Sequence, residues 1–161
     1  AQFLGGVAGV QVVTVLLMPY VAHPSVNYAI TVPGPYGSGL AFVAELVISF
    51  GLMLVVLTAS NTPQVARFTG LFVGALLAAY TMMEAPFSGM SMNPARTVAS
   101  AVHAQVWTSI WIYFAAPVLG MLAAAEVSLQ VRRGDMPACP KLHHDNAMRC
   151  IFCGKLAEGT L

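Results

Sequence analysis

The sequence predicts an all-α membrane protein in which four helices cross the bilayer and a further half-length helix enters it and stops. Hydrophobic residues make up 58% of the 161 residues, charged residues only 8%, and the mean hydropathy is +0.76, an apolar share far above that of a soluble domain. Long apolar runs occur at about residues 1–20, 40–60, 66–84 and 107–129, and each is close to the ~20 residues that a spanning helix needs.

The first two runs are separated by a segment rich in helix breakers. Residues 1–20 carry no charge, and residues 23–39 contain Pro24, Pro33 and Pro35 together with three glycines, so we expect a loop there. The second run, 40–60, contains Glu45. A carboxylate at membrane depth needs hydrogen-bond donors or a proton, which makes it a candidate functional group. The alternative is a glutamate near a helix end that reaches the headgroups.

The last two runs carry small residues at every fourth position, which is typical of close helix packing in membranes. These residues are Gly70, Gly74 and Ala78 in the run 66–84, and Ala116, Gly120 and Ala124 in the run 107–129. Trp107, Trp111 and Tyr113 at the start of the fourth run predict an aromatic belt at the membrane interface.

Charge divides the chain into a membrane region, 1–131, and a polar tail, 132–161. Before residue 132 the charged residues are limited to Glu45, Arg67, Glu84, Arg96 and Glu126. Positive-inside counting places Arg67 and the basic tail on one side of the membrane, and residues 23–39, which lack Lys and Arg, on the other. We therefore expect an integral protein of the cell membrane, plasma or inner, with a cytoplasmic tail.

The most informative stretch is 88–97, between the last two apolar runs. Asn93 before Pro94 is typical of a helix N-cap followed by the first helical residue. The helical tract that follows, 94–102, is too short to cross a bilayer. A half-helix N-terminus buried at membrane depth carries partial positive charge and free N–H donors, so it can line a pore. The alternative for Arg96 is a re-entrant turn with the side chain snorkelling to the interface.

The run Ser88-Gly89-Met90-Ser91-Met92-Asn93-Pro94-Ala95-Arg96 resembles the second signature loop of the aquaporin family, the major intrinsic proteins. The resemblance implies an aquaporin-like bundle in which residues 1–20 form the third helix and residues 40–129 form the whole second repeat. The first two helices and the first Asn-Pro-Ala loop are then absent, and we interpret the chain as the C-terminal piece of a longer protein. Two opposed half-helices cannot form from this chain alone.

The resemblance also implies roles for individual residues. Asn93, with Pro94 and Ala95, would donate hydrogen bonds to a solute at mid-membrane, and Glu45 would brace the pore loop. The outer constriction would comprise Thr81, Met90 and Arg96, with a further residue from the missing second helix. Thr81 and Met90 depart from the pattern of water channels, whereas the residues at four subgroup positions favour water over glycerol: Thr97, Ala101, Tyr113 and Phe114.

We therefore expect a passive water channel that is a homotetramer in the lipid bilayer. A channel for glycerol or another small neutral solute is the first alternative, and a truncated, non-conducting subunit with a metal-binding tail is the second. Transport needs no cofactor, and the spans contain no nucleophile-base set or phosphate loop typical of an enzyme. A net charge of +1 without a basic stripe argues against nucleic-acid binding.

The tail contains a second candidate site. Its Cys and His residues are Cys139, His143, His144, Cys150 and Cys153. Cys and His in such proximity can supply the four donors of a structural Zn²⁺, and zinc could fold a tail with few apolar residues. An unstructured tail with unrelated thiols remains the alternative.

Overall fold

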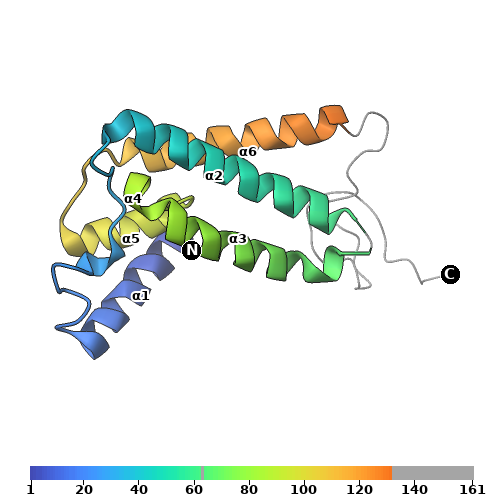
Figure 1. Ribbon diagram of the computed structural model, residues 1–161. Helices are drawn as coiled ribbons and strands as arrows, with labels where there is room; N and C mark the ends of the chain where they lie inside the picture. The colour runs from blue at the N-terminus through green and yellow to red at the C-terminus, as the bar shows by residue number, and fades with distance from the viewer. Residues whose placement is uncertain (63, 132–161) are drawn as a thin grey trace.

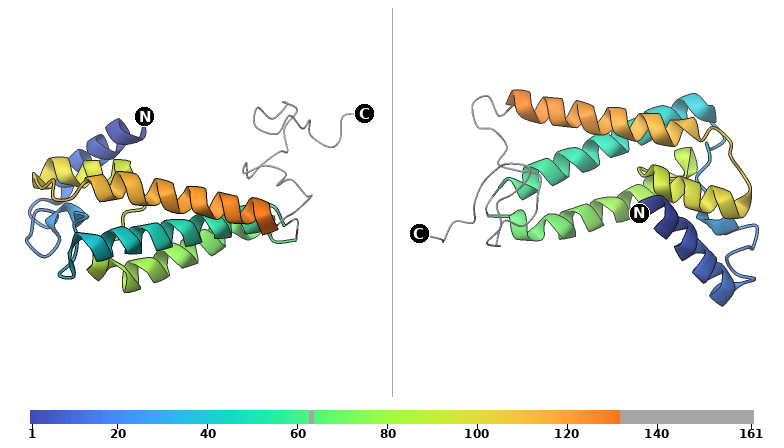
Figure 2. Two further views of the ribbon diagram at one scale, coloured as in Figure 1. Left: turned by 90° about the horizontal axis from the view of Figure 1, so that it is seen from above. Right: turned by 180° about the vertical axis from the view of Figure 1, so that it is seen from behind.

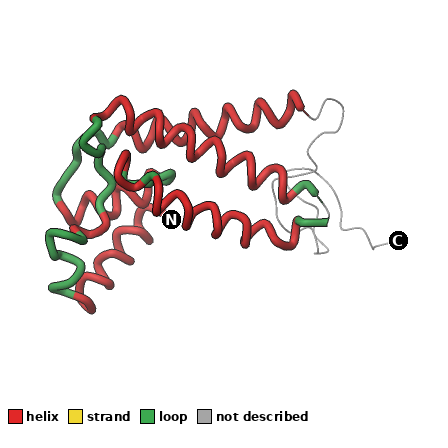
Figure 3. Tube along the Cα trace, in the orientation of Figure 1, coloured by secondary structure: helices red, strands yellow, loops and turns green. Residues whose placement is uncertain are grey.

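The computed structural model describes residues 1–62 and 64–131, and this part of the chain is helical, without a β-strand (Figure 3). The elements in chain order are α1 (Gln2–Leu17), η1 (Asn27–Ala29), α2 (Gly37–Ser60), η2 (Ala66–Phe68), α3 (Thr69–Met83), α4 (Ala85–Ser88), α5 (Pro94–Ala104) and α6 (Trp111–Val131). The prediction of an all-α bundle is confirmed.

Helices α2 and α6 pack against each other and form the most extensive helix–helix contact of the described residues, although their C-terminal ends diverge (Figures 1 and 2). Ala41 on α2 and Ala116 on α6 are fully buried in one cluster between them. Gly120 allows the closest approach, because a Cβ there would lie 2.3 Å from the carbonyl oxygen of Leu46. The predicted small-residue face of α6 therefore packs as expected.

The corresponding small-residue face of α3 does not pack against any described residue. Gly70 and Gly74 are exposed, and a Cβ at either position would have no heavy atom within 4 Å. The same pattern has a different outcome on the two helices because small residues permit close approach but do not specify a partner.

Three helical segments are long and apolar enough to cross a membrane: 37–60 with 24 residues, 66–83 with 18, and 111–131 with 21. Helix α1 has only 16 residues, or about 24 Å at 1.5 Å per residue, which is less than the ~30 Å hydrocarbon core. The predicted span 1–20 is thus too long. Met18 is extended (ψ 134°) because the residue before a proline, here Pro19, is disfavoured in the helical region.

Helix α5 is the half-length helix of the structure, and it packs beside α1 (Figures 1 and 2). It begins near the middle of the bundle and ends where residues 18–36 and 105–110 gather (Figure 3). Its 11 residues span about 16 Å, roughly half of a bilayer core. Asn93 and Arg96 belong to the start of α5, and both side chains are exposed.

Candidate functional site

The start of α5 is set by a side-chain cap. Asn93 is extended (φ −144°, ψ 112°), and its Oδ1 accepts a hydrogen bond from the Ala95 N–H at 2.9 Å. Pro94, the first helical residue, has no N–H that would need a partner. Because Oδ1 is used by the cap, the two hydrogens of the Asn93 amide remain as donors on an exposed side chain.

Glu45 of α2 holds the loop before α5 through three hydrogen bonds. Its Oε1 accepts from the Ser88 hydroxyl at 2.6 Å and from the Ser91 N–H at 2.7 Å, and its Oε2 accepts from the Met92 N–H at 2.8 Å. The carboxylate is fully buried, so these charge-assisted bonds offset the cost of its burial. Glu45 therefore binds the loop with both of its carboxylate oxygens.

The loop needs this support because its backbone is strained. Gly89, Met90 and Met92 have φ values of 81°, 52° and 51°, in the left-handed region that costs a non-glycine residue about 1–2 kcal/mol. Only glycine fits at position 89, where a Cβ would also lie 2.9 Å from Thr31 Cα. These turns direct the N–H groups of Ser91 and Met92 toward Glu45. The carbonyls of the same peptide units point away from it.

Tyr113 of α6 is a further supporting residue that the sequence did not predict. We expected an interfacial position, but Tyr113 is fully buried and its hydroxyl donates to the carbonyl oxygen of Ser88 at 2.6 Å. An aromatic pattern predicts the interface only on average. A tyrosine close behind two tryptophans in the sequence gives no sign that its hydroxyl has a partner 25 residues earlier in the chain.

Three hydroxyls behind the loop form a buried chain. Thr31 Oγ1 donates to Thr97 Oγ1 at 2.8 Å, and Thr97 Oγ1 is hydrogen-bonded to Ser91 Oγ. Ser91 Oγ in turn donates to the Asn93 carbonyl oxygen at 3.0 Å. The segment before α2, the signature loop and the first turn of α5 are thereby linked.

The structure brings the three predicted constriction residues to the same loop. Thr81 Oγ1 donates to the Leu77 carbonyl at 2.8 Å and lies 3.7 Å from Met90 Sδ. Arg96 Nη1 lies 3.5 Å from the carbonyl oxygen of Gly89, the residue before Met90. The Thr81–Met90 wall is mainly apolar because the threonine hydroxyl is directed back to its own helix, and Arg96 supplies the donors.

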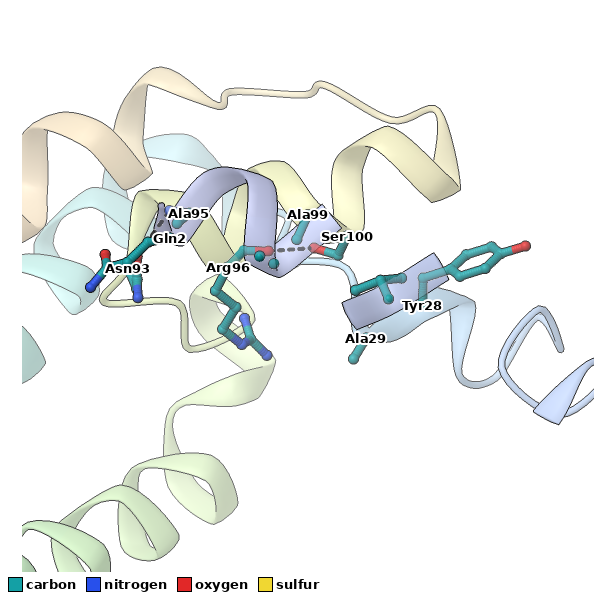
Figure 4. Close-up of a pocket in the computed structure, with 11 residues that line it drawn as sticks. Gln2, Tyr28, Ala29, Asn93, Ala95, Arg96, Ala99 and Ser100 are labelled. Carbon is teal, nitrogen blue, oxygen red and sulfur yellow. Dashed lines mark hydrogen bonds between the residues drawn. The ribbon is translucent and has the colours of Figure 1, made fainter. Parts of the chain in front are cut away.

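Asn93 and Arg96 also line a pocket of about 570 Å³ between α1, α5 and η1. In Figure 4, Asn93 and Gln2 lie at one end of this pocket and Tyr28 and Ala29 at the other, with Arg96 between them. The small residues Gly5, Gly6 and Ala99 keep α1 and α5 from filling it. Gln2 and Tyr28 are pocket residues that the sequence did not predict, since no motif marks them.

The predicted zinc ligands lie outside the described residues, and zinc binding by the tail stays a prediction. Within residues 1–62 and 64–131, no group of three or more His, Cys, Asp or Glu side chains could hold a metal ion. The described site therefore consists of hydrogen-bonding groups, one guanidinium and an apolar wall.

The family model described as "Major intrinsic protein" matches residues 1–127. The chain belongs to the major intrinsic protein family. Among curated proteins, it is 37% identical to aquaporin NIP2-3 of Zea mays over 142 residues, which is 88% of this chain and 45% of that protein. It is 39% identical to aquaporin NIP3-1 of Zea mays over 117 residues, or 71% of this chain and 39% of that protein.

Aquaporin NIP6-1 of Arabidopsis thaliana is 33% identical over 140 residues, which is 86% of this chain and 46% of that protein. The chain thus spans less than half the length of these curated relatives. The predicted family is confirmed, and membership of this family together with the three long apolar helices makes this an integral membrane protein.

Proposed function

We propose that this chain contributes one half of a passive transmembrane channel that conducts water. The observation that carries the proposal is the capped start of the half-length helix α5, where the exposed Asn93 amide has donors to offer. The N-terminus of α5 adds roughly half a positive charge at the same depth. Water molecules in single file would donate hydrogen bonds to the carbonyls of Met90 and Ser91 and accept them from the Asn93 amide. These bonds fix the orientation of each water molecule, and the fixed orientation opposes proton transfer along the file.

Arg96 is the second element of the proposed selectivity. Its guanidinium is permanently charged and offers several donors to a passing solute, and a fixed positive charge in a narrow pore repels cations and protons. With Thr81 and Met90 opposite, the constriction has one polar and one apolar side.

The apolar side supports a second candidate, glycerol or another small neutral solute. A molecule with both hydroxyl and CH groups can hydrogen-bond Arg96 while its carbon atoms contact the Met90 thioether and the Thr81 methyl. Water needs only the polar side. The two candidates are separated by comparing swelling of vesicles in a glycerol gradient with shrinkage under an impermeant osmolyte.

The proposed assembly is a homotetramer in the cell membrane with the tail on the cytoplasmic side. Large apolar side chains on α1 and α3 are exposed, among them Leu4, Val15, Leu71 and Met82 with 68–80% of their surface accessible, as expected of faces that meet lipid or further protein. Helix α6 ends at the end of the bundle where α3 begins (Figure 1). This arrangement supports placing Arg67 and the tail on one side.

Stopped-flow light scattering on proteoliposomes of the full-length protein tests the proposal. Asn93→Asp replaces donors by a charge, and Arg96→Glu reverses the charge of the constriction, so either should lower water permeability by about tenfold or more, the equivalent of one lost charge-assisted contact. Glu126→Gln, at an exposed residue of α6, is the matched control and should conduct normally. Vesicles that swell no faster than empty ones in every variant would favour the non-conducting alternative.

A further inference from the structure

Glu84 is a second buried carboxylate at the signature loop, and the proposed function does not use it. It lies between α3 and α4, with 7% of its surface exposed, and neither carboxylate oxygen has a hydrogen-bond partner among the described residues. A buried, ionised and unpaired carboxylate costs several kcal/mol. Glu84 must therefore carry a proton or be balanced by a nearby positive charge.

The donors around Glu84 are almost all engaged elsewhere. The Ser88 hydroxyl and the Met90 N–H are the donors that approach Glu84, and the Glu45, Tyr113 and Arg96 side chains act on it over a longer range. Ser88 donates to Glu45, Met90 donates to Ser88 Oγ, and Tyr113 donates to the Ser88 carbonyl. The Arg96 guanidinium, in contrast, lies beside Gly89, whose N–H donates to the carbonyl of Ala85, the residue after Glu84, and it has N–H groups to spare.

Arg96 is also weakly held. Its contact with the Gly89 carbonyl is 3.5 Å long, at the outer limit of a hydrogen bond, although a guanidinium has five N–H groups to place. Both the position and the net charge of the constriction therefore depend on what else attracts this side chain.

We propose that Glu84 is a positioning residue of the outer constriction that acts through Arg96. While Glu84 is protonated, the guanidinium stays beside the Gly89 carbonyl and its full charge faces the solute. When Glu84 ionises, it draws the guanidinium toward the corner between α3 and α4 and offsets its charge. Solute permeability then depends on pH through one carboxyl group, and this inference rests on the proposed channel function.

The test is the water permeability of proteoliposomes of the full-length protein from about pH 5 to about pH 9, a range that covers buried glutamates. The wild-type protein should show a single step of about threefold, the size expected when one polar contact of the constriction is redirected. Glu84→Gln keeps the shape but cannot ionise, so it should hold the low-pH permeability throughout. Glu84→Asp keeps a titrating carboxyl and should keep a step, and the control Glu126→Gln should match the wild type.

A second readout does not depend on conduction. The infrared difference spectrum between low and high pH should contain the carbonyl band of a protonated carboxylic acid, and this band should be missing in Glu84→Gln. A conducting channel whose pH profile is flat, or unchanged in Glu84→Gln, overturns the inference and leaves the proposed function intact. Permeability no higher than that of empty vesicles at every pH overturns both.

Discussion

Replacing Glu45 by glutamine gives the most direct test of how the signature loop is held. Glutamine has the shape of glutamate but only one acceptor oxygen. With that oxygen at the Oε1 position, the bonds from Ser88 and Ser91 remain. The amide NH₂ takes the place of Oε2, so the Met92 N–H, which donates to Oε2 in the wild-type protein, faces another donor. One charge-assisted bond is lost and a buried N–H is left without an acceptor, because Met92 is only 8% exposed.

The expected cost of Glu45→Gln is about 2–3 kcal/mol, the penalty for leaving one buried partner of a charged group unsatisfied. For a chain of this size that corresponds to a fall in Tm of roughly 5–10 °C. Glu45→Ala removes all three bonds and should cost about twice as much. Unfolding of the detergent-solubilised full-length protein, followed by tryptophan fluorescence, measures both values.

Glu126→Gln is the control for removing a negative charge, since Glu126 is exposed and bonds only to Gln130 in the described structure. It should shift the Tm by no more than about 1–2 °C, as surface substitutions do. If Glu45→Gln unfolds at the same temperature as Glu126→Gln and conducts as well as the wild type, the loop does not depend on the carboxylate and the reasoning is refuted.

Two further predictions concern packing around the loop. Gly120→Ala places a Cβ 2.3 Å from the Leu46 carbonyl oxygen, so α2 and α6 must separate at a cost of about 1–3 kcal/mol. Gly39→Ala is the control, because its Cβ would have nothing within 4 Å. Equal Tm values for the two variants would contradict the prediction. Thr97→Val removes the middle hydroxyl of the buried chain and leaves the Thr31 hydroxyl without an acceptor. It should lower the free energy of unfolding, measured with denaturant, by about 1–3 kcal/mol. An unchanged denaturation midpoint would show that the hydroxyl chain contributes no stability.

Features that depend on local chemistry could be predicted from the sequence. Asn93 followed by Pro94 favours a helix start, because the cap and the missing N–H are properties of the two residues themselves. The half-length of α5 was likewise expected from the lack of a long apolar tract after Pro94. The composition of the four apolar runs gave the all-α class, which the structure confirms.

Features that depend on distant partners could not be predicted. The burial of Tyr113 depends on a carbonyl of the loop before α5, and the position of Thr97 depends on Thr31, which is 66 residues away. Glu84 drew no attention because it stands at the end of an apolar run, where a glutamate usually reaches water. Pro19 indicates that α1 ends early, but hydropathy averaged over 20 residues does not depend on the backbone conformation of a single residue.

The proposed constriction depends on the best-packed pair of described helices, and this explains why its residues can be placed on a strained loop. The side chains that hold the loop come from α2 and α6, as Glu45 and Tyr113, and α2 and α6 are in backbone contact at Gly120. A strained loop persists only where its surroundings over-determine it. A small separation of α2 and α6 therefore moves Glu45 and Tyr113 apart and shifts the Met90 side of the proposed constriction. Gly120→Ala should thus alter the permeability per folded channel as well as the stability. The same substitution on the exposed face of α3, Gly74→Ala, touches no described atom and lacks this route to the constriction.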